Sequence, residues 1–256
     1  MVKLSEQEPK FKNKTMFILK FTKKEYAESL QNGDLYMNNF KWFIEQEKNT
    51  GERGQGDVLE SSLNINKIEY TLLHQETNEI IYEGTAENLN MTFDDLIYQP
   101  VFSATSLDGE LLEIEKEDEE SYYTKLVFTE EQKTAFTEIF KADHVLVVPF
   151  DVFSAKITNY AEENKIALIG KKVIYDDYSI NNSARMKSFE KLDKDVFFWK
   201  DNALSYQNEY RVVVLNDVET PFVPNIGDLS ANSKIYTTDE IFSGEFRLII
   251  RKNAII

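Results

Sequence analysis

The chain has 256 residues, of which 42% are apolar, and its 45 acidic against 29 basic residues give a formal net charge of −16. The apolar share, which includes 18 Phe and 13 Tyr, excludes a chain that is disordered throughout. The absence of cysteine excludes a disulfide framework, a thiolate metal site and a cysteine nucleophile. Because glycine and proline are scarce and mark no linker, we expect residues 1–256 to form a single domain.

The charge and the apolar runs also restrict location and partners. No apolar run approaches the ~20 residues that cross a bilayer, and the N-terminus lacks the apolar segment of a secretory signal. A surface this acidic repels phosphate backbones, which argues against general nucleic-acid binding. The two histidines, His74 and His144, are too few for a transition-metal site. We therefore expect a cytoplasmic protein with no membrane partner and no bound metal.

The N-terminal part, residues 1–107, opens with a predicted strand and helix. The β-branched and aromatic run at 15–21 predicts a strand. Thr22 and Glu25 have the spacing of a capping box, which predicts a short helix that stops near Gly33. A second short strand is expected at 33–37.

The rest of the N-terminal part predicts a helix, a loop and a hairpin. Apolar residues on one face predict an amphipathic helix at 39–49, and three closely spaced glycines predict a flexible loop at 50–60. The segments 63–74 and 78–84 alternate apolar and polar residues on either side of a polar turn. This pattern predicts a β-hairpin.

An acidic segment follows at residues 108–120, where eight acidic residues accompany one lysine. Like charges this close together repel one another, which favours a solvated loop or a frayed helix. We interpret the segment as an insertion between the N-terminal part, 1–107, and a C-terminal part, 121–256. It supplies seven of the sixteen net negative charges.

The C-terminal part begins with alternating helices and strands. Thr129 and Gln132 again have capping-box spacing, which predicts a helix at 130–141. The continuous apolar run at 144–150 predicts a buried strand, and Asp151 is expected to cap the amphipathic helix after it.

The remaining C-terminal elements complete the expected fold. Residues 165–178 predict a bent strand or a hairpin around Gly170, and a helical stretch is expected at about 183–200. The apolar runs at 209–216 and 246–256 predict two further strands. Short connections between strands and separated helices indicate an α+β fold, with mixed or antiparallel sheets and peripheral helices.

Three segments together resemble the ADP-ribosyltransferase superfamily. They are FILKFTKKEYAESLQNGDLYM (17–37), VFSATSL (101–107) and SYQNEYRVVV (205–214), about 40 residues in all. In that superfamily a strand–helix opening precedes an aromatic-Ser-Thr-Ser strand and, later, a Gln-x-Glu turn that enters an apolar strand. Here Ala104 is inserted into the Ser-Thr-Ser strand. The resemblance implies an ADP-ribosyltransferase-like core and NAD as the cofactor.

The resemblance also implies roles for particular residues. Cleavage of the bond between nicotinamide and ribose passes through a cationic sugar, which a nearby carboxylate stabilises. Glu209, at the start of a buried strand, is the candidate for this catalytic carboxylate. Gln207, two residues earlier on a chain expected to be extended, would point to the same side and orient the acceptor. The candidate cofactor-binding residues are Lys20, Ser103, Thr105, Tyr206 and Arg211.

Simpler interpretations of the same residues stay open. Glu209 and Arg211 could form an ordinary salt bridge on an exposed strand face, and Ser103 and Thr105 are common strand residues. The superfamily places an Arg or His on its first strand, whereas this chain has Lys20 there. A lysine cannot form the planar bidentate contact of an arginine with phosphate. A degenerate, non-catalytic relative is therefore an alternative to an active enzyme.

The order of blocks along the chain resembles a second group, an uncharacterised bacterial and phage domain family. The matching blocks are RGQGDVLES at 53–61, Pro-Phe-Asp at 149–151, a Val-x-Tyr strand, a lysine and a Glu-x-Arg strand. The match covers most of residues 17–60 and 145–215. It implies an order of elements and no particular chemistry.

We therefore expect an NAD- or nucleotide-binding, ADP-ribosyltransferase-like protein that acts in conflict between bacteria and phages. If active, it would transfer ADP-ribose or cleave NAD. The alternative is a non-catalytic acidic module, for example a phage anti-defence inhibitor, that docks on the basic surface of a partner protein. A third hypothesis is a nucleotide sensor that keeps the pocket and has lost turnover.

Overall fold

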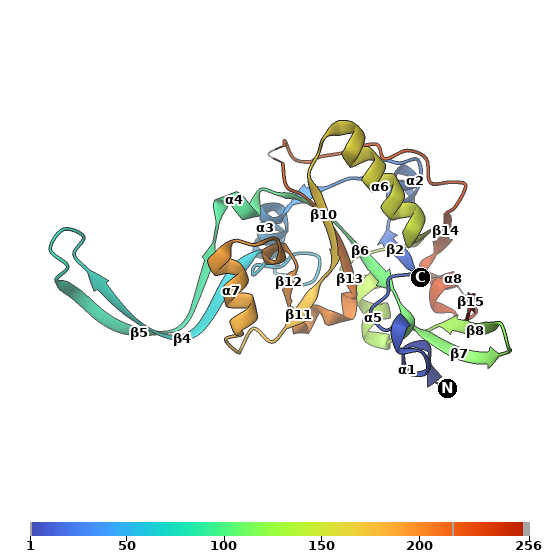
Figure 1. Ribbon diagram of the computed structural model, residues 1–256, viewed down its shortest axis with the longest axis horizontal. Coiled ribbons are helices and arrows are strands. Elements are labelled where there is room, and N and C mark those ends of the chain that lie inside the picture. The colour runs from blue at the N-terminus through green and yellow to red at the C-terminus, as the bar shows by residue number, and fades with distance from the viewer. Residues whose placement is uncertain (1, 217, 253–256) are drawn as a thin grey trace.

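The structure, a computed structural model, describes residues 2–216 and 218–252. Helices and mainly antiparallel sheets confirm the expected α+β class (Figure 1). A seven-stranded sheet lies at the centre. In order across that sheet its strands are β10 (Leu168–Lys172), β13 (Glu209–Val214), β6 (Pro100–Leu107), β2 (Phe17–Thr22), β9 (His144–Pro149) and β14 (Lys234–Thr237), with β3 (Asn38–Asn39) paired to β6.

Three smaller sheets surround this central sheet. The first contains β1 (Val2–Lys3), β7 (Leu112–Glu117), β8 (Ser121–Leu126) and β15 (Arg247–Arg251). The second pairs β11 (Ile174–Asp176) with β12 (Trp199–Asp201) in parallel. The third is the hairpin of β4 (Ser62–Leu73) and β5 (Ile80–Thr92), which confirms the hairpin expected from the sequence and extends it.

Helices pack on both faces of the central sheet. Their bounds are α1 (Leu4–Gln7), α2 (Lys24–Gln31), α3 (Phe40–Thr50), α4 (Asp94–Ile97), α5 (Glu130–Thr134), α6 (Phe150–Asn164), α7 (Ser183–Lys191) and α8 (Thr238–Phe242). On one face α2 and α6 bury Leu30 and Phe153 against Ile18 and Val212. The opposite face carries two separate apolar clusters, one that includes Leu107 of β6 and one that includes Val101.

The acidic segment is structured, and the expectation of a solvated loop is wrong. Residues Gly109–Leu111 form a 3₁₀ turn, and the next six residues form β7, between β1 and β8. Leu111 and Leu112 are buried in the core. Cations offset the acidic charge in five ion pairs, Asp108–Lys172, Glu110–Lys3, Glu113–Lys125, Glu115–Arg247 and Glu117–Lys252.

Two expectations for the opening block are corrected. Helix α2 begins at Lys24, and its N-cap residue, Lys23, makes no capping hydrogen bond through its side chain. Thr22 ends β2 instead, since it still pairs with His144 of β9. The strand expected at 33–37 is reduced to isolated bridges, which Asp34 and Met37 make with the segment around 222–225.

Several C-terminal boundaries also differ from the sequence expectation. Gly170 lies inside β10, opposite Val212, so 165–178 contains two strands and no hairpin around the glycine. The helix expected at 183–200 ends at Lys191, because Leu192 adopts a left-handed conformation and a 3₁₀ turn and β12 follow. Pro149 takes the N-cap position that was expected for Asp151.

Other C-terminal elements agree with the sequence. The capping box of Thr129 and Gln132 is present, although the helix continues as a π-helical turn at Ala135–Ile139. The strands β9, β13 and β15 form where apolar runs predicted them. The last positions of the expected strand 246–256 lie outside the described residues. Among the helices of the described ranges, none has the length and apolar character needed to span a membrane.

Candidate functional site

A polar band crosses one face of the central sheet between two apolar clusters. Along this face of β6 the residues are Val101, Ser103, Thr105 and Leu107, because alternate residues of a strand share a face. Val101 packs with the cluster around Phe40, and Leu107 packs with a second cluster. Ser103 and Thr105 therefore lie between two apolar clusters of the core.

Strand β13 continues this polar band. Glu209 lies directly opposite Thr105, and Arg211 lies opposite Ser103. Opposed residues of antiparallel strands have Cα atoms about 4.5–5.5 Å apart and their side chains on one face. The structure thus brings Glu209 together with the hydroxyl residues of the FSATSL strand.

The neighbouring strands β2 and β6 separate at the edge of this band. They pair only from Phe17 to Leu19, although β2 continues along β9 to Thr22. Lys20 lies at the point of separation, where its Nζ donates a hydrogen bond of 2.6 Å to the carbonyl oxygen of Ser103. The ammonium group thereby satisfies a backbone acceptor that the missing strand pairing leaves open.

A cavity of about 780 Å³ opens at this separation. Six of the seven candidate residues line it, namely Lys20, Ser103, Thr105, Gln207, Glu209 and Arg211. Nine aromatic residues of the described ranges also line it, among them Phe21, Tyr36, Phe40, Trp42, Phe102 and Phe140. Its volume and its mainly apolar lining with a few convergent polar groups are typical of small-molecule sites.

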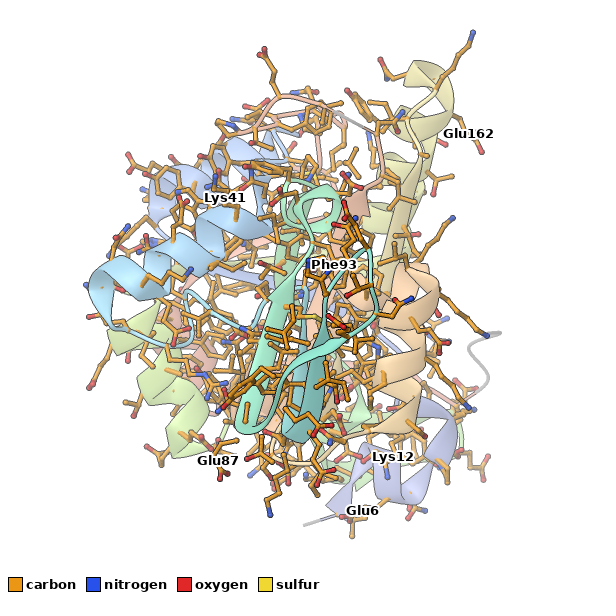
Figure 2. All side chains as sticks on the ribbon, turned by 90° about the vertical axis from the view of Figure 1, so that its left-hand side faces the viewer. Glu6, Lys12, Lys41, Glu87, Phe93 and Glu162 are labelled. Atoms are coloured by element: carbon orange, nitrogen blue, oxygen red, sulfur yellow. The ribbon has the colours of Figure 1, made fainter. Side chains whose placement is uncertain are left out.

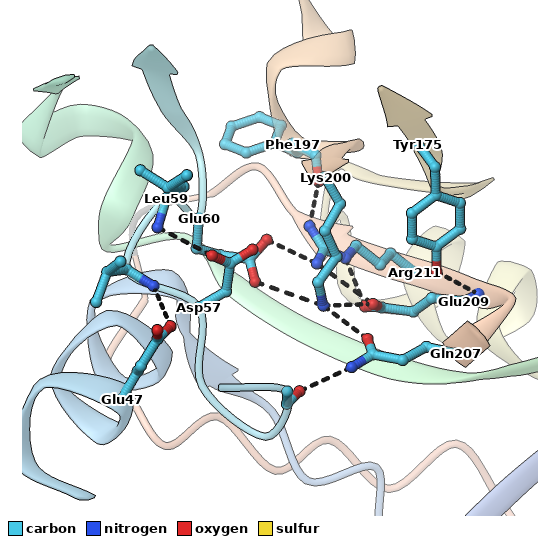
Figure 3. A network of polar contacts seen from close by, with 12 residues as sticks. Glu47, Asp57, Leu59, Glu60, Tyr175, Phe197, Lys200, Gln207, Glu209 and Arg211 are labelled. Atoms are coloured by element: carbon cyan, nitrogen blue, oxygen red, sulfur yellow. Dashed lines mark hydrogen bonds and ion pairs between the residues drawn. The ribbon is translucent and has the colours of Figure 1, made fainter. Parts of the chain in front are cut away.

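At the floor of the cavity Glu209 is held by two cations (Figure 3). Its Oε1 lies 2.6 Å from Nε of Arg211, and its Oε2 lies 2.8 Å from Nζ of Lys200. The same ammonium donates to Oε1 of Gln207 at 2.8 Å. Lys200 thus joins the side chains of Gln207 and Glu209, the two candidate catalytic residues.

A second carboxylate completes this buried ionic network. Oε1 of Glu60 lies 2.7 Å from Nη2 of Arg211, and its Oε2 lies 3.8 Å from Nζ of Lys200. All four ionic side chains are at most 6% exposed. Two carboxylates and two cations therefore balance one another in the interior, which is the condition for burying charges at acceptable cost.

The glycine-rich loop before Glu60 packs against this network. The carbonyl oxygen of Gly54 accepts a hydrogen bond of 2.8 Å from Nε2 of Gln207. A Cβ atom at Gly56 would lie only 2.5 Å from the backbone nitrogen of Glu47 in α3. Gly56 is buried, and the loop is fixed against the helix there. The expectation of a flexible loop is therefore wrong for this part of residues 50–60.

Charge and burial shift the pKa values of these groups in different directions. Burial alone would raise the pKa of Glu209, but Arg211 and Lys200 outweigh it and lower that pKa far below its usual range. Burial raises the pKa of Glu60 and of Asp57. At Lys20 burial lowers the pKa to about 8, although Glu209 opposes the shift. Glu209 is therefore ionised at neutral pH.

The structure gives Arg211 a different setting from the exposed salt bridge considered above. The residue is 1% exposed. Its Nη1 donates to the carbonyl oxygen of Phe197 at 2.8 Å, and its other nitrogens contact Glu60 and Glu209. The guanidinium is thus fully engaged by protein groups.

Gln207 and Tyr206 also differ from their expected settings. Residues Asn202–Gln207 form a 3₁₀ helix and Asn208 is left-handed, so the extended-chain argument for Gln207 is wrong, although Lys200 still joins it to Glu209. Tyr206 does not belong to the cavity lining. Its carbonyl oxygen instead accepts a hydrogen bond from Gln132 at 2.9 Å.

The sequence reasoning missed Lys200 and Glu60 as site residues. Glu60 is far from Glu209 in the sequence, and Lys200 belongs to none of the three segments that carry the ADP-ribosyltransferase resemblance. The available signal was the second resemblance, in which the RGQGDVLES block and a lysine accompany the Glu-x-Arg strand. These blocks supply Glu60, Lys200, Glu209 and Arg211, and the structure unites them.

The comparisons with other proteins add no relative. Searches against protein-family models, curated proteins and solved structures find no match for this chain. Within residues 2–216 and 218–252, no three His, Asp or Glu side chains gather as a group of metal ligands.

Proposed function

We propose that the chain binds NAD or a related nucleotide in this cavity, in an ADP-ribosyltransferase-like manner. The observation that carries the proposal is the convergence of Lys20, Ser103, Thr105, Gln207 and Glu209 on one aromatic-lined cavity of about 780 Å³. These residues come from three distant parts of the sequence. The ADP-ribosyltransferase resemblance, which rests on the sequence alone, implies the same residues.

The lining matches the chemistry of a dinucleotide. Aromatic side chains such as Phe102 and Trp42 offer faces on which a nicotinamide or adenine ring can stack. The Lys20 ammonium supplies a cation for a phosphate, and the Ser103 and Thr105 hydroxyls can bind ribose oxygens. Glu209 supplies the ionised carboxylate that a cationic ribose requires.

The ionic network around Glu209 predicts that the protein cleaves NAD slowly. Both oxygens of Glu209 are paired, and the two cations that hold them reduce the negative field available to a developing sugar cation. We therefore propose that nucleotide binding is the main activity and that transfer or hydrolysis is weak. The acidic docking surface considered for residues 108–120 has less support, because most of its charges are paired.

The chemical part of this proposal is tested by nicotinamide release from NAD. We expect a slow release by the wild type that Glu209→Gln lowers by about tenfold or more, less than the roughly 100- to 1,000-fold usual for one electrostatic group because both oxygens of Glu209 are already paired. Thermal unfolding of both proteins checks that the variant is folded at the assay temperature. Equal rates in wild type, variant and buffer would contradict the catalytic role of Glu209 and leave nucleotide binding to be judged separately.

Ligand affinity is expected to depend on the protonation of Lys20. Because the pKa of Lys20 is about 8, its ammonium is charged at pH 7 and mostly neutral at pH 9. An ion pair with a phosphate worth about 1 kcal/mol then predicts about fivefold weaker binding of ADP-ribose at the higher pH. Titration calorimetry at the two pH values measures this change.

The matched variants are Lys20→Arg and Lys20→Ala. The arginine stays charged at both pH values, so its affinity is expected to stay constant, whereas the alanine variant binds weakly at both. An equal loss of affinity in wild type and in Lys20→Arg would contradict the role of this amine.

A further inference from the structure

The β4–β5 hairpin extends well beyond the body of the protein (Figure 1). Its base is fixed, because Asn66 and Asn181 exchange two hydrogen bonds of 2.8 Å and Nδ2 of Asn66 donates to the carbonyl oxygen of Tyr178. Leu63 at the base is buried in the core. We call the projecting part beyond this anchor, residues 67–87, the arm. Figure 2 views the molecule from the side on which the arm projects and labels Glu87, the last residue of the arm.

Below its tip the arm has one apolar and one acidic face; at the tip, Leu73 lies on the side of Glu69 and is also exposed. Leu72 lies opposite Tyr82, and Tyr70 shares their face, with the two tyrosine rings 6.0 Å apart. The other face carries Glu69 and Glu83, which lie opposite Thr85 and Thr71 respectively. This alternation is the pattern of a strand pair that buries one face against another surface.

The apolar face of the arm is open to solvent. Leu72 is 52% exposed and Tyr82 is 54% exposed. At the tip, where the register shifts, Ile81 is 63% exposed. Contiguous exposed side chains of this size usually mark a surface that another molecule covers.

The edges of the arm are open as well. In the described strands β4 and β5 pair only with each other, so the outer edge of each presents unpaired N–H and C=O groups. An isolated pair of strands is marginally stable in water, and a third strand stabilises it. Addition of a strand from another chain is a common mode of peptide recognition.

The charge of the arm selects the chemistry of that strand. Residues 67–87 contain five glutamates and one lysine. A second copy of this chain would bring the same acidic face and a net charge of −16, which repel. A strand in which lysine or arginine alternates with apolar residues places its cations on the same face of the sheet as Glu69 and Glu83. Its apolar side chains then extend the face of Tyr70 and Leu72.

We propose that the arm binds an extended segment of another protein as an added β-strand, and that this segment alternates apolar with basic residues. The interaction is independent of the nucleotide cavity. The backbone edge supplies affinity, and the two faces of the arm supply specificity for the side chains of the segment.

The test uses a synthetic, fluorescently labelled peptide of about ten residues that alternates valine and lysine, a typical strand length. Fluorescence anisotropy follows its binding to the full chain at about 50 mM salt and at about 500 mM salt, without nucleotide. We expect binding at low salt that weakens about tenfold at high salt. A peptide of the same composition with all lysines in one block is expected to bind about tenfold less well.

Two variants assign the binding to the arm. Glu69→Lys combined with Glu83→Lys is expected to lose the lysine peptide and to bind a peptide that alternates valine and glutamate. Leu72→Asn combined with Tyr82→Asn is expected to lose the alternating lysine peptide while the thermal midpoint stays unchanged, because these side chains lie outside the core. The proposal is overturned if both peptide orders bind equally, if the charge-reversed variant keeps the lysine peptide, or if no peptide binds. It is also overturned if sedimentation shows that the wild type dimerises through the arm.

Discussion

Replacement of Glu209 by glutamine is expected to lower the free energy of unfolding by about 3–5 kcal/mol, the usual cost of removing one partner from a buried ion pair. The side chains of Arg211 and Lys200 remain buried after the replacement, and Glu60 remains as the carboxylate that forms ion pairs with both. An amide of the same size leaves the packing unchanged, so the loss reports the charge. Urea-induced unfolding followed by circular dichroism measures it.

The matched control is Glu28→Gln in the exposed pair of Lys24 and Glu28 on α2. Their charged atoms are 3.7 Å apart and their side chains are 64% and 53% exposed. Solvent screening limits such a pair to about 0–1 kcal/mol. If Glu209→Gln cost no more than this control, the description of Glu209 as part of a buried, balanced network would be wrong.

The loss at Glu209 is also expected to depend on pH. Because the folded-state pKa of Glu209 is lowered, its stabilisation is complete above the unfolded value of about 4.3 and declines as the pH falls below that value. The difference in stability between wild type and Glu209→Gln is therefore expected to be constant from neutral pH down to about pH 5 and to shrink below about pH 4.

Substitution of Gly56 by alanine is expected to destabilise the protein by about 3 kcal/mol, at the upper end for an overpacked position. The added Cβ would lie 2.5 Å from the backbone nitrogen of Glu47 and 2.6 Å from the carbonyl oxygen of Phe43. Neither backbone atom can move without displacing α3. The loop must therefore shift. This displaces Glu60 and disturbs the hydrogen bond that Gly54 accepts from Gln207.

Gly51→Ala is the control for this substitution. Gly51 is left-handed with φ of 69°, and no atom lies within 4 Å of the position that an added Cβ would take, so only backbone strain of about 1 kcal/mol is expected. Chemical denaturation of both variants gives the comparison. An equal or larger loss for Gly51→Ala would show that the loop is not fixed at Gly56.

Local pattern was sufficient to predict much of the fold. The alternating runs that became β4 and β5 and the apolar runs that became β9 and β13 are periodic over their whole length. The acidic segment was misread because its composition was considered without its partners. Those partners, such as Lys125 and Arg247, lie on other strands of the same sheet, and a local count of charge cannot include them.

The candidate site was predicted in part. The ADP-ribosyltransferase resemblance implies that Ser103, Thr105 and Glu209 belong to one site. In the structure their strands, β6 and β13, are neighbours. The ion pairs of Glu60 with Arg211 and Lys200 could not be predicted from spacing, because Glu60 is separated from both cations by more than half of the chain. A pair of this kind is a consequence of the tertiary fold, and the spacing of its residues along the chain does not predict it.

Titration calorimetry with NAD tests directly whether the cavity beside β6 and β13 binds a nucleotide. The comparison variant is Ser103→Trp, which places a large side chain on the cavity face opposite Arg211. We expect the wild type to bind one NAD per chain and the variant to bind none at the same concentrations, with both proteins showing the same far-ultraviolet circular dichroism. No heat of binding in the wild type, or equal affinity in the folded variant, would contradict nucleotide binding in this cavity.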